Sequence, residues 1–401
     1  MKPMLRYLTG LSVADWEEEL RDVGIYRPDP QIVEALSNFA VIKARGYSRE
    51  EISQITSDLM PEIILLEFMG DDAPEAALLA GNPQNLKRFR DFVFPDMAPI
   101  SEDFFLRMRG LVENVLSHHR WEYTIPGGKL ILEDGKPLIM GILNVTPDSF
   151  SDGGKFLDAG RAVEHGRKML EAGADVLDIG GESTRPGAPE VPAEEEWRRI
   201  APVLKELLEI EGCVVSVDTT KSEVAGRALE AGAHIINDIS GMTFDPRMRE
   251  VVARYGVPVI LMHIKGTPRT MQKNPHYHLL LEEVTDFLHQ RCREAHEQGI
   301  DQIIVDPGIG FGKRPEDNLE LIRRLGELKA LGYPILLGPS RKSFIGHVLD
   351  RPVEERLIGT LTSVVYGIMQ GAHIVRVHDV EETHQAVKLV RAIREGKALS
   401  T

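Results

Sequence analysis

From residue 138 onward, short apolar runs alternate with longer amphipathic stretches along the chain. Consecutive apolar positions are typical of parallel strands buried on both faces, and amphipathic stretches are typical of helices that cover such a sheet. The pattern predicts eight strands, at 138–143, 176–179, 214–217, 234–236, 257–262, 303–305, 335–337 and 373–377. The predicted helices lie at 161–171, 194–209, 223–230, 279–297, 317–330, 354–370 and 380–394.

Eight such units over about 260 residues match the usual size of a (β/α)8 barrel. Several helical stretches end in a glycine close to the next strand, for example Gly173, Gly232 and Gly371, which suits the left-handed position where a helix stops. An open, doubly wound sheet is the alternative, but even units without a signal for a change in strand order favour closure. The sequence therefore predicts an α/β fold built on a (β/α)8 TIM barrel.

The first 120 residues show a different pattern and no recognisable chemistry. We expect a small α-rich or α/β amino-terminal domain over 1–120, of unknown role, followed by the barrel over 121–397. The expected elements of the first domain are helices at 31–44, 49–59, 84–92 and 101–118 and short strands at 63–66 and 76–79. The junction at 121–137 contains Pro126 followed by Gly127 and Gly128, which predicts a hairpin placed to plug the bottom of the barrel.

Composition narrows the class of protein further. Of 401 residues, 42% are hydrophobic and 27% are charged, which is typical of a globular protein with a large core. A net charge of −15 argues against general nucleic-acid binding, so an anionic ligand needs a local cluster of cations. Cys213 and Cys292 lie far apart, which excludes a disulfide framework or a cysteine zinc site. Without a long apolar stretch or a signal-peptide core, we expect a cytoplasmic protein that does not enter a membrane.

Polar or ionisable residues follow every predicted strand. In a closed barrel the carboxyl ends of the strands meet at one face, where the catalytic groups are found. The residues are Asn144, Asp178, Asp218, Asn237, Asp238, His263, Asp306, Ser340, Arg341, Lys342, Arg376 and His378. A set so rich in carboxylates and amides is unlike ordinary loop composition, so we expect one polar site at this face.

Two cationic segments suggest the kind of ligand. Arg376 lies in the last predicted strand and His378 directly follows it, two positions on, so in extended backbone their side chains share one face. Arginine offers paired donors and histidine a third, which suits a diphosphate, whereas a surface pair between Arg376 and Asp379 is the simpler alternative. Lys342 follows the seventh strand, a region where such barrels often bind phosphate.

The segment 306–313 contains three glycines, but their order fits neither the P-loop nor the dinucleotide-binding spacing. We expect Gly308 and Gly310 to let the backbone approach a flat ligand, with Phe311 as a wall. The residues alone thus point to a ligand that combines a flat ring with an anionic group.

Eight motifs in this order resemble the dihydropteroate synthase family over about 121–397. They are GILNVTPDSFSDGG at 141–154, DIGGESTRPG at 178–187, SVDT at 216–219, INDI at 236–239, LMH at 261–263, DPG at 306–308, SRKS at 340–343 and RVHD at 376–379. The resemblance implies an enzyme of folate biosynthesis that joins p-aminobenzoate to 6-hydroxymethyl-7,8-dihydropterin diphosphate, giving 7,8-dihydropteroate and pyrophosphate. It also implies a homodimer and a sulfonamide target. The extension over 1–120 is absent from compact members of the family.

The resemblance assigns roles residue by residue. The pterin contacts are Asp218, Asn237, Met262, Asp306 and Lys342. The diphosphate contacts are Asn144, Arg376 and His378, and Asn144 is the expected protein ligand of Mg²⁺. The p-aminobenzoate pocket and its closing loops comprise Phe150, Asp152, Thr184, Arg185, Pro186, Phe311 and Ser340. The implied catalytic set is Asp218, Asp306, Lys342, Arg376 and His378.

Two other functions stay open at this point. A pterin-binding methyltransferase barrel shares the pocket of Asp218, Asn237 and Asp306, but it has no need of Lys342 or the Arg376 fork. A pterin-binding paralogue without activity, working through residues 1–120 and a partner, is the non-enzyme alternative. The intact set of site residues favours the synthase.

Overall fold

The structure is a computed structural model that describes residues 4–8, 19, 40–45, 64–67, 76–81, 110–115, 117–146, 155–184 and 187–397. The chain forms two compact units, one of Met1–His119 with Arg323–Gly332 and one of Arg120–Ile322 with Tyr333–Thr401. The first unit therefore includes a ten-residue segment that follows the sixth strand of the predicted barrel. In the part of the chain that is described, no helix has the length and apolar character needed to cross a bilayer.

The first unit contains a four-stranded antiparallel sheet in the order β1-β2-β4-β3. Its strands are β1 (Met4–Leu8), β2 (Ala40–Arg45), β3 (Ile64–Glu67) and β4 (Ala76–Gly81). The strands predicted at 63–66 and 76–79 are confirmed, and residues 110–115 are helical within the predicted 101–118. The helix predicted at 31–44 is wrong over 40–44, because Val41 and Ile42 favour a strand that pairs on both sides. The helices predicted at 49–59 and 84–92 lie outside the described residues.

A buried ionic network lies within this first unit. Glu19 pairs with Arg6, with Lys43 at 2.6 Å and with Arg324 at 3.0 Å. Glu327 in turn pairs with Arg324 at 2.6 Å and with Arg6 at 3.1 Å. Arginines and glutamates that are taken out of water need such partners, and here two of them come from the segment Arg323–Gly332.

The second unit is a closed barrel of eight parallel strands, as predicted. Its order is β12-β11-β10-β9-β8-β7-β14-β13, and the bridge between Val305 and Ile335 closes β12 onto β13. The open-sheet alternative is therefore wrong. The strands are β7 (Leu138–Asn144), β8 (Val176–Gly180), β9 (Val214–Asp218), β10 (Ile235–Asp238), β11 (Val259–Met262), β12 (Ile303–Asp306), β13 (Leu336–Leu337) and β14 (Ile374–Val377).

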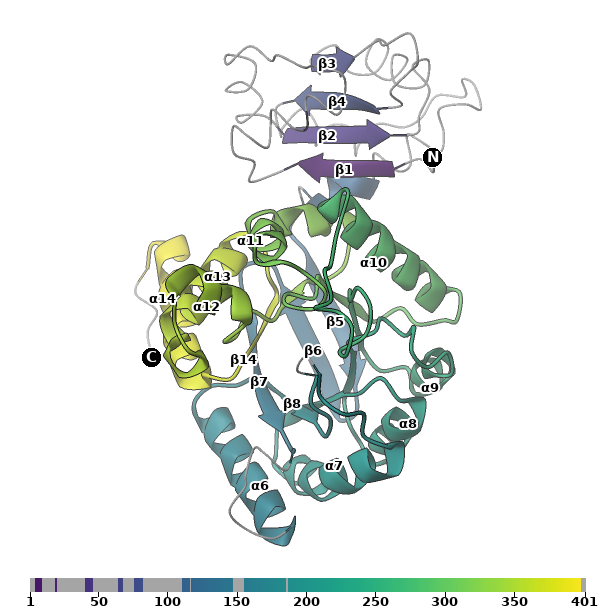
Figure 1. Ribbon diagram of the computed structural model, residues 1–401, viewed down its shortest axis with the longest axis vertical. Helices are drawn as coiled ribbons and strands as arrows, with labels where there is room; N and C mark the ends of the chain where they lie inside the picture. Colours follow the sequence, from purple (N-terminus) through teal and green to yellow (C-terminus); the bar gives the residue numbers. More distant parts are fainter. Residues whose placement is uncertain are drawn as a thin grey trace. The chain divides into compact units, whose positions relative to one another are not determined.

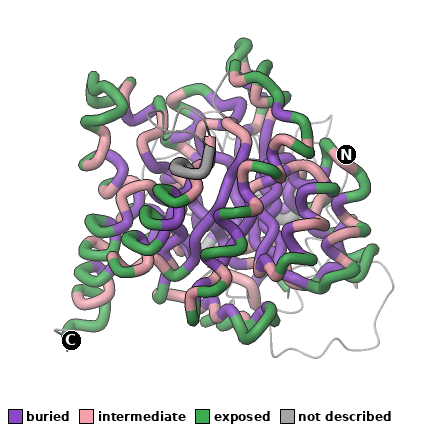
Figure 2. Tube along the Cα trace, turned by 90° about the horizontal axis from the view of Figure 1, so that it is seen from below, coloured by how far each residue is buried: buried purple, intermediate pink, exposed green. Residues whose placement is uncertain are grey.

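Helices surround these strands, which are buried while the outer faces of the helices are exposed (Figures 1 and 2). The helices are α6 (Lys155–Glu171), α7 (Ala193–Leu208), α8 (Ser222–Glu230), α9 (Met248–Tyr255), α10 (Leu280–His296), α11 (Pro315–Arg323), α12 (Ser343–Leu349), α13 (Leu357–Met369) and α14 (Val380–Glu395), with the 3-10 turn η3 (Val353–Glu355). The 3-10 turn η2 (Leu325–Leu331) belongs to the first unit.

Two helix predictions need correction. The single helix predicted at 317–330 is divided, because the backbone of Arg324 leaves the helical region where its side chain joins Glu19 and Glu327. The helix predicted at 354–370 begins only at Leu357, after the short turn η3. In both places a tertiary contact or a turn interrupts a continuous helical pattern.

A hairpin covers the end of the barrel where the strands begin. Strands β5 (Arg120–Ile125) and β6 (Gly128–Glu133) pair in register, with Tyr123 opposite Leu130, and Gly127 takes the left-handed conformation in the turn. The Tyr123 hydroxyl donates a hydrogen bond to the carbonyl of Ile303 at 2.7 Å. The apolar face of the hairpin packs on residues at the start of the strands, namely Met140, Val176, Ile235, Ile260, Ile304, Leu336 and Ile374. The predicted plug is confirmed, and the opposite end is left for chemistry.

Candidate active site at the carboxyl ends of the strands

A guanidinium bridging two carboxylates lies at the centre of this end of the barrel. Arg376 of β14 donates through Nε to Asp178 Oδ2 at 2.6 Å and through Nη2 to Asp218 Oδ2 at 2.8 Å. Asn237 donates through Nδ2 to the same Asp178 oxygen at 3.0 Å. The alternative of a surface pair between Arg376 and Asp379 is therefore wrong.

Burial changes the acidity of the carboxylates at this site. It raises the pKa of Asp218 to about 7, with the neighbouring Asp178 carboxylate adding to the rise and Arg376 opposing it. Burial also raises the pKa of Asp306 to about 6, although the Gly308 amide and the Lys342 ammonium stabilise its charge. Both side chains thus titrate close to neutral pH, so a ligand N–H group can meet either form with little cost.

Lys342 supplies a second cation at the start of α12. Burial and the nearby Arg376 charge lower the pKa of Lys342 to about 8, so the ammonium persists at neutral pH. Its Nζ lies 4.1 Å from the centroid of the Phe311 ring. Among the described residues it has no hydrogen-bond partner. Lys342 is therefore a half-buried cation that is available to a ligand.

The glycines of the segment 306–313 make room for other parts of the protein. A Cβ at Gly310 would lie 2.9 Å from Lys342 Cδ, and a Cβ at Gly308 would collide with the carbonyl oxygen of His263. Both glycines also have positive φ angles. Packing thus explains these glycines, and the predicted close approach of a flat ligand stays a prediction.

An apolar wall adjoins the polar groups. Met262, at the end of β11, is buried with Phe311 and Ile239, and Ile264 and Met271 complete the cluster. Next to it, the Lys313 ammonium lies 2.9 Å from His263 Nδ1 and donates to the Phe311 carbonyl at 3.1 Å. Lys313 therefore fixes the loop that carries the aromatic wall.

His378 is a neutral side chain in this structure. Burial and the adjacent Arg376 charge lower its pKa to about 4. The Ser340 hydroxyl accepts a hydrogen bond from the His378 backbone amide at 3.1 Å and lies 2.9 Å from its Nδ1. If the hydroxyl hydrogen goes to Nδ1, the ring hydrogen is on Nε2, free to donate to an anion. The fork predicted from sequence thus combines one cation with one neutral donor.

Asn144 ends β7 beside the bridged carboxylates. A Cβ built on Gly180 would lie 3.8 Å from Asn144 Oδ1 and 3.9 Å from Asp218 Oδ2, so these two oxygens face the same small gap. In the described part of the chain, no three His, Cys, Asp or Glu side chains form a ready metal site. A metal ion at this gap would depend on Asn144 and on oxygens of the ligand.

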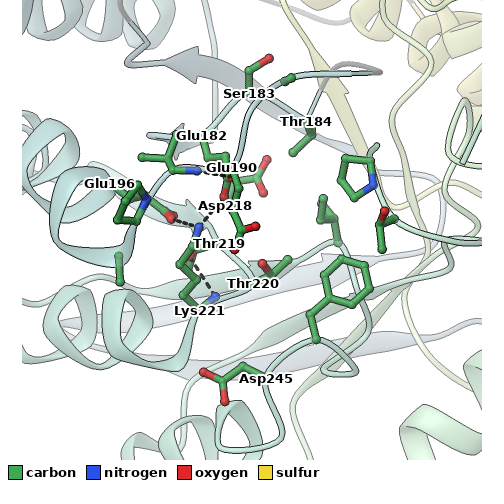
Figure 3. Close-up of a pocket in the computed structure, with 18 of the residues that line it drawn as sticks. Glu182, Ser183, Thr184, Glu190, Glu196, Asp218, Thr219, Thr220, Lys221 and Asp245 are labelled. Carbon is green, nitrogen blue, oxygen red and sulfur yellow. Dashed lines mark hydrogen bonds and ion pairs between the residues drawn. The ribbon is translucent and has the colours of Figure 1, made fainter. Parts of the chain in front are cut away.

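A cavity of about 620 Å³ opens beside these residues, between the loops after β8, β9, β10 and β11 (Figure 3). Thr184 and Asp218 line it, whereas Asn237, Met262, Asp306, Lys342 and Arg376 do not. Of the predicted loop residues, Phe150, Asp152, Arg185 and Pro186 lie outside the described residues. The cavity therefore adjoins the predicted pocket at Asp218 and Thr184 and does not represent the whole of it.

A charged clamp holds the base of the loop after β8. The Lys221 ammonium binds both Glu182 and the buried Glu196 of α7 (Figure 3). Glu182 also accepts a hydrogen bond from the Val191 amide at 2.9 Å, which joins the two ends of the loop. No motif in the sequence predicted this clamp, and the one local signal for it is a lysine three residues after Asp218.

The relatives of this chain agree with the geometry. Residues 140–378 match the model of a family described as pterin binding enzyme. A dihydropteroate synthase from Synechocystis sp. is 48% identical over 273 residues, which are 67% of this chain and 94% of that protein. The chain belongs to the dihydropteroate synthase family. The Escherichia coli synthase is 46% identical over 268 residues, which are 66% of this chain and 95% of that protein.

Solved structures of dihydropteroate synthases share the barrel. The Yersinia pestis enzyme, in a sulfonamide drug complex, is 43% identical with a TM-score of 0.64, covering 69% of this chain and 100% of that one. The Xanthomonas albilineans enzyme with 4-aminobenzoic acid is 43% identical with a TM-score of 0.65, covering 69% and 99%. These relatives make the chain a transferase that forms a C–N bond. They disfavour the methyltransferase and the inactive paralogue considered from sequence.

The structure brings together most of the residues that the family resemblance implies. The charges of Asp218, Asp306 and Arg376 all act on the pKa of Lys342, and His378 adjoins Arg376. Asp178, which the sequence placed among the strand-end residues but to which the resemblance gave no role, is a central member of this group because it accepts hydrogen bonds from both Arg376 and Asn237. The sequence feature that marks Asp178 is a carboxylate at the third position of an otherwise apolar strand.

Proposed function

We propose that this dihydropteroate synthase joins p-aminobenzoate to 6-hydroxymethyl-7,8-dihydropterin diphosphate through the residues at the carboxyl ends of its strands. The observation that carries the proposal is the group of the buried Asp306 with the half-buried Asp218, Lys342 and Arg376, in which carboxylates near their pKa lie beside two cations. Such a group suits a fused ring with alternating donors and acceptors and an anionic substituent.

The pterin ring lies among complementary polar groups. Asp218 and Asp306 accept hydrogen bonds from its N–H groups, Asn237 offers both a donor and an acceptor, and Lys342 donates to the ring carbonyl and a ring nitrogen. Met262 packs on the ring face, next to Phe311. Because these groups are buried, each one left unpaired by a wrong ligand carries a desolvation cost, which gives the pocket its selectivity.

Arg376 and His378 hold the diphosphate. The C–O bond of the pterin methylene breaks, and its electron pair leaves with the diphosphate, whose growing charge meets the Arg376 guanidinium and the His378 Nε2 hydrogen. The methylene carbon gains cationic character, which the pterin ring and the nearby Asp218 carboxylate stabilise. The p-aminobenzoate nitrogen then bonds to this carbon and loses a proton, giving dihydropteroate and pyrophosphate.

The loops after β7 and β8 complete the p-aminobenzoate pocket. Phe150, Thr184, Pro186, Phe311 and Ser340 contact this substrate in our proposal, while Asp152 and Arg185 order the closed loops. The clamp of Lys221 on Glu182 supports the assignment, because it fixes the base from which the second loop extends. Closure excludes water, which competes with the amine for the cationic carbon.

The residues fit a magnesium ion at Asn144. Its side-chain oxygen faces the gap above Gly180, and in the described residues it has no hydrogen-bond partner. Mg²⁺ usually takes few protein ligands and several phosphate or water oxygens, as this gap requires. When bound, the ion neutralises charge on the diphosphate. Titration calorimetry of pterin diphosphate with and without Mg²⁺, on the native chain and on Asn144→Ala, tests this: the ion should tighten binding only in the native chain.

A homodimer is supported by an exposed apolar face on α13 and α14. Ile358, Met369, Leu389 and Ile393 are 76%, 60%, 62% and 70% exposed, which is unusual for large apolar side chains on neighbouring helices. We propose that a second copy of the chain covers this face. Analytical ultracentrifugation should show a dimer that Ile358→Glu dissociates. The cytoplasmic location expected from sequence stays a prediction.

Release of pyrophosphate tests the proposed activity. The purified chain, given pterin diphosphate and Mg²⁺, should release pyrophosphate only when p-aminobenzoate is added, and a sulfonamide should compete with p-aminobenzoate. A protein that binds the pterin diphosphate but releases no pyrophosphate would refute the proposal. The same assay on a chain that starts near Trp121 shows whether turnover needs residues 1–120.

A further inference from the structure

The turn after β13 carries a strained residue between two site residues. Arg341, flanked by Ser340 and Lys342, has a φ of +54°, in the left-handed region that side chains other than glycine rarely adopt. Strain of this kind persists only where the surroundings hold the residue in place. The contacts of Arg341 therefore decide where its two neighbours lie.

The start of α13 holds the backbone of this residue. The Arg341 amide donates a hydrogen bond to Thr360 Oγ1 at 2.9 Å, and its carbonyl accepts one from Arg356 Nη1 at 3.1 Å. Thr360 is fully buried. Both polar groups of the strained peptide are thus satisfied by side chains of one helix, which fixes the turn against the barrel.

The side chain of Arg341 reaches to the neighbouring strand end. Its Nε donates to Asp379 Oδ2 at 3.0 Å and its Nη2 to Asp379 Oδ1, a two-point pair. Asp379 directly follows His378, and its side chain is largely buried. This pair and the Ser340–His378 contact tie the turn after β13 to the end of β14 at two points.

The position of the Lys342 ammonium depends on this turn, whereas the position of the Arg376 guanidinium is fixed by its own ion pairs. Two carboxylates hold Arg376 directly, whereas the Lys342 ammonium has the Phe311 ring beside it and, among the described residues, no hydrogen-bond partner. The backbone of the turn sets where the Lys342 side chain begins, and the side chain then packs on Gly310 and on the Phe311 ring.

We propose that Arg341 is a positioning residue: its pair with Asp379 holds the left-handed turn that aims Lys342 at the pterin ring and Ser340 at p-aminobenzoate. The roles of Lys342 and Ser340 in this statement rest on the proposed function. Arg341 itself touches neither substrate. Its loss should therefore change substrate affinity and turnover without removing any group that binds substrate.

Glycine at position 341 separates the conformation from the side-chain pair. Arg341→Gly adopts a positive φ without strain, so the variant should fold, but it lacks the pair with Asp379. We expect the KM for p-aminobenzoate and the Kd for a phosphate-free dihydropterin to rise about 10-fold, and kcat to fall about 10-fold to 100-fold. Asp379→Asn should change KM, Kd and kcat in the same direction. The double variant should lose no more activity than the more impaired of the two single variants, because both changes remove the same ion pair.

Arg351→Ala is the matched control, because it removes an exposed arginine whose ion pair with Glu355 lies close by along the chain. It should keep KM and kcat within about twofold of the native chain, as expected for an exposed pair. Turnover by the native chain tests the proposed function. The ratios of KM, Kd and kcat between the variants and the native chain test the role of Arg341. The Kd for the dihydropterin can be measured even if the chain shows no turnover. If Arg341→Gly and Asp379→Asn lower only the melting temperature and leave KM, Kd and kcat unchanged, Arg341 has a structural role alone and the inference is overturned.

Discussion

The two ends of the eight-stranded barrel are different environments. At the start of the strands, the hairpin β5–β6 closes the barrel with apolar side chains such as Leu132 and one Tyr123 hydroxyl that donates to Ile303. At their carboxyl ends, buried and half-buried carboxylates and cations lie together, and the loss of contact with water moves their pKa values toward neutrality. One end satisfies its groups within the protein, and the other keeps groups available for a ligand.

This difference separates stability from chemistry within one sheet. The hairpin end gains free energy by removing apolar area from water. The site end loses free energy, because charged groups are buried beside one another before a ligand arrives. Substitutions at the two ends should therefore have opposite signatures, and the following predictions test that contrast.

The largest effect is expected at Arg376. Arg376→Met should lower kcat/KM for the pterin diphosphate about 1000-fold, because a cation that meets the developing charge of the leaving group contributes about 4 kcal/mol. Binding of a dihydropterin without phosphates should weaken far less. Steady-state kinetics and calorimetry with both ligands measure the two losses. Arg376→Lys keeps the positive charge but not the paired donors, so its kcat/KM should lie between those of Arg376→Met and the native chain. Equal losses for the two ligands contradict the assignment.

At the opposite end, Leu132→Ala should act on stability alone. Leu132 is fully buried in the hairpin cluster, so truncation should lower the free energy of unfolding by about 3 kcal/mol. The kcat of the folded variant should stay at the native value. Urea denaturation followed by activity per folded molecule measures both quantities, with Leu132→Met as the volume-conserving control. A loss of kcat without a loss of stability would show that the hairpin end takes part in chemistry.

Asp306→Asn should lower turnover and yet raise the free energy of unfolding, by an amount that depends on pH. The pKa of Asp306 is raised from near 4 to about 6, so the folded chain binds a proton more tightly than the unfolded chain. This contribution to stability is present below pH 4 and is lost as the pH rises through 6. The variant should therefore gain stability over the native chain as pH rises, by about 2 kcal/mol at pH 8, while turnover is lost. Melting curves at pH 5 and 8 decide it: an equal gain at both values contradicts the charge effect.

The smallest effect is expected at Tyr123. Tyr123→Phe removes the hydrogen bond to the Ile303 carbonyl and should lower the free energy of unfolding by about 1 kcal/mol. Turnover should be unchanged at every pH. Thermal unfolding and the pyrophosphate assay on the same preparation test this, and a shifted pH profile of kcat would link the two ends of the barrel.

Much of the barrel was predictable because local sequence and global fold agree there. Each apolar run became a strand within two residues at either end, since continuous apolar positions fit only a strand buried on both faces. The hairpin followed from Pro126 and Gly127, which are typical of a turn. In contrast, the pattern did not predict β2 or the break at Arg324, because these depend on partners distant in sequence.

The site was predictable in its membership but not in its pairing. Spacing places Asp218, Asp306, Lys342 and Arg376 at strand ends, and closure of the barrel then brings them to one face. The partners of Arg376 are Asp178 and Asp218 rather than Asp379, which Arg341 binds instead. The protonation of His378 likewise depends on burial and on Arg376, which no local pattern contains.

By itself, the sequence determined the barrel, its plug and the residue types at the strand ends. The apolar runs, the amphipathic stretches between them and the glycines and motifs beside them are all patterns of residues that lie close together along the chain. Only the tertiary structure decided which charges share a hydrogen bond, which pKa values move toward neutrality and which residue holds the turn at 340–342. Those properties depend on distance and burial in three dimensions, and Coulomb interactions in a buried site change steeply with both.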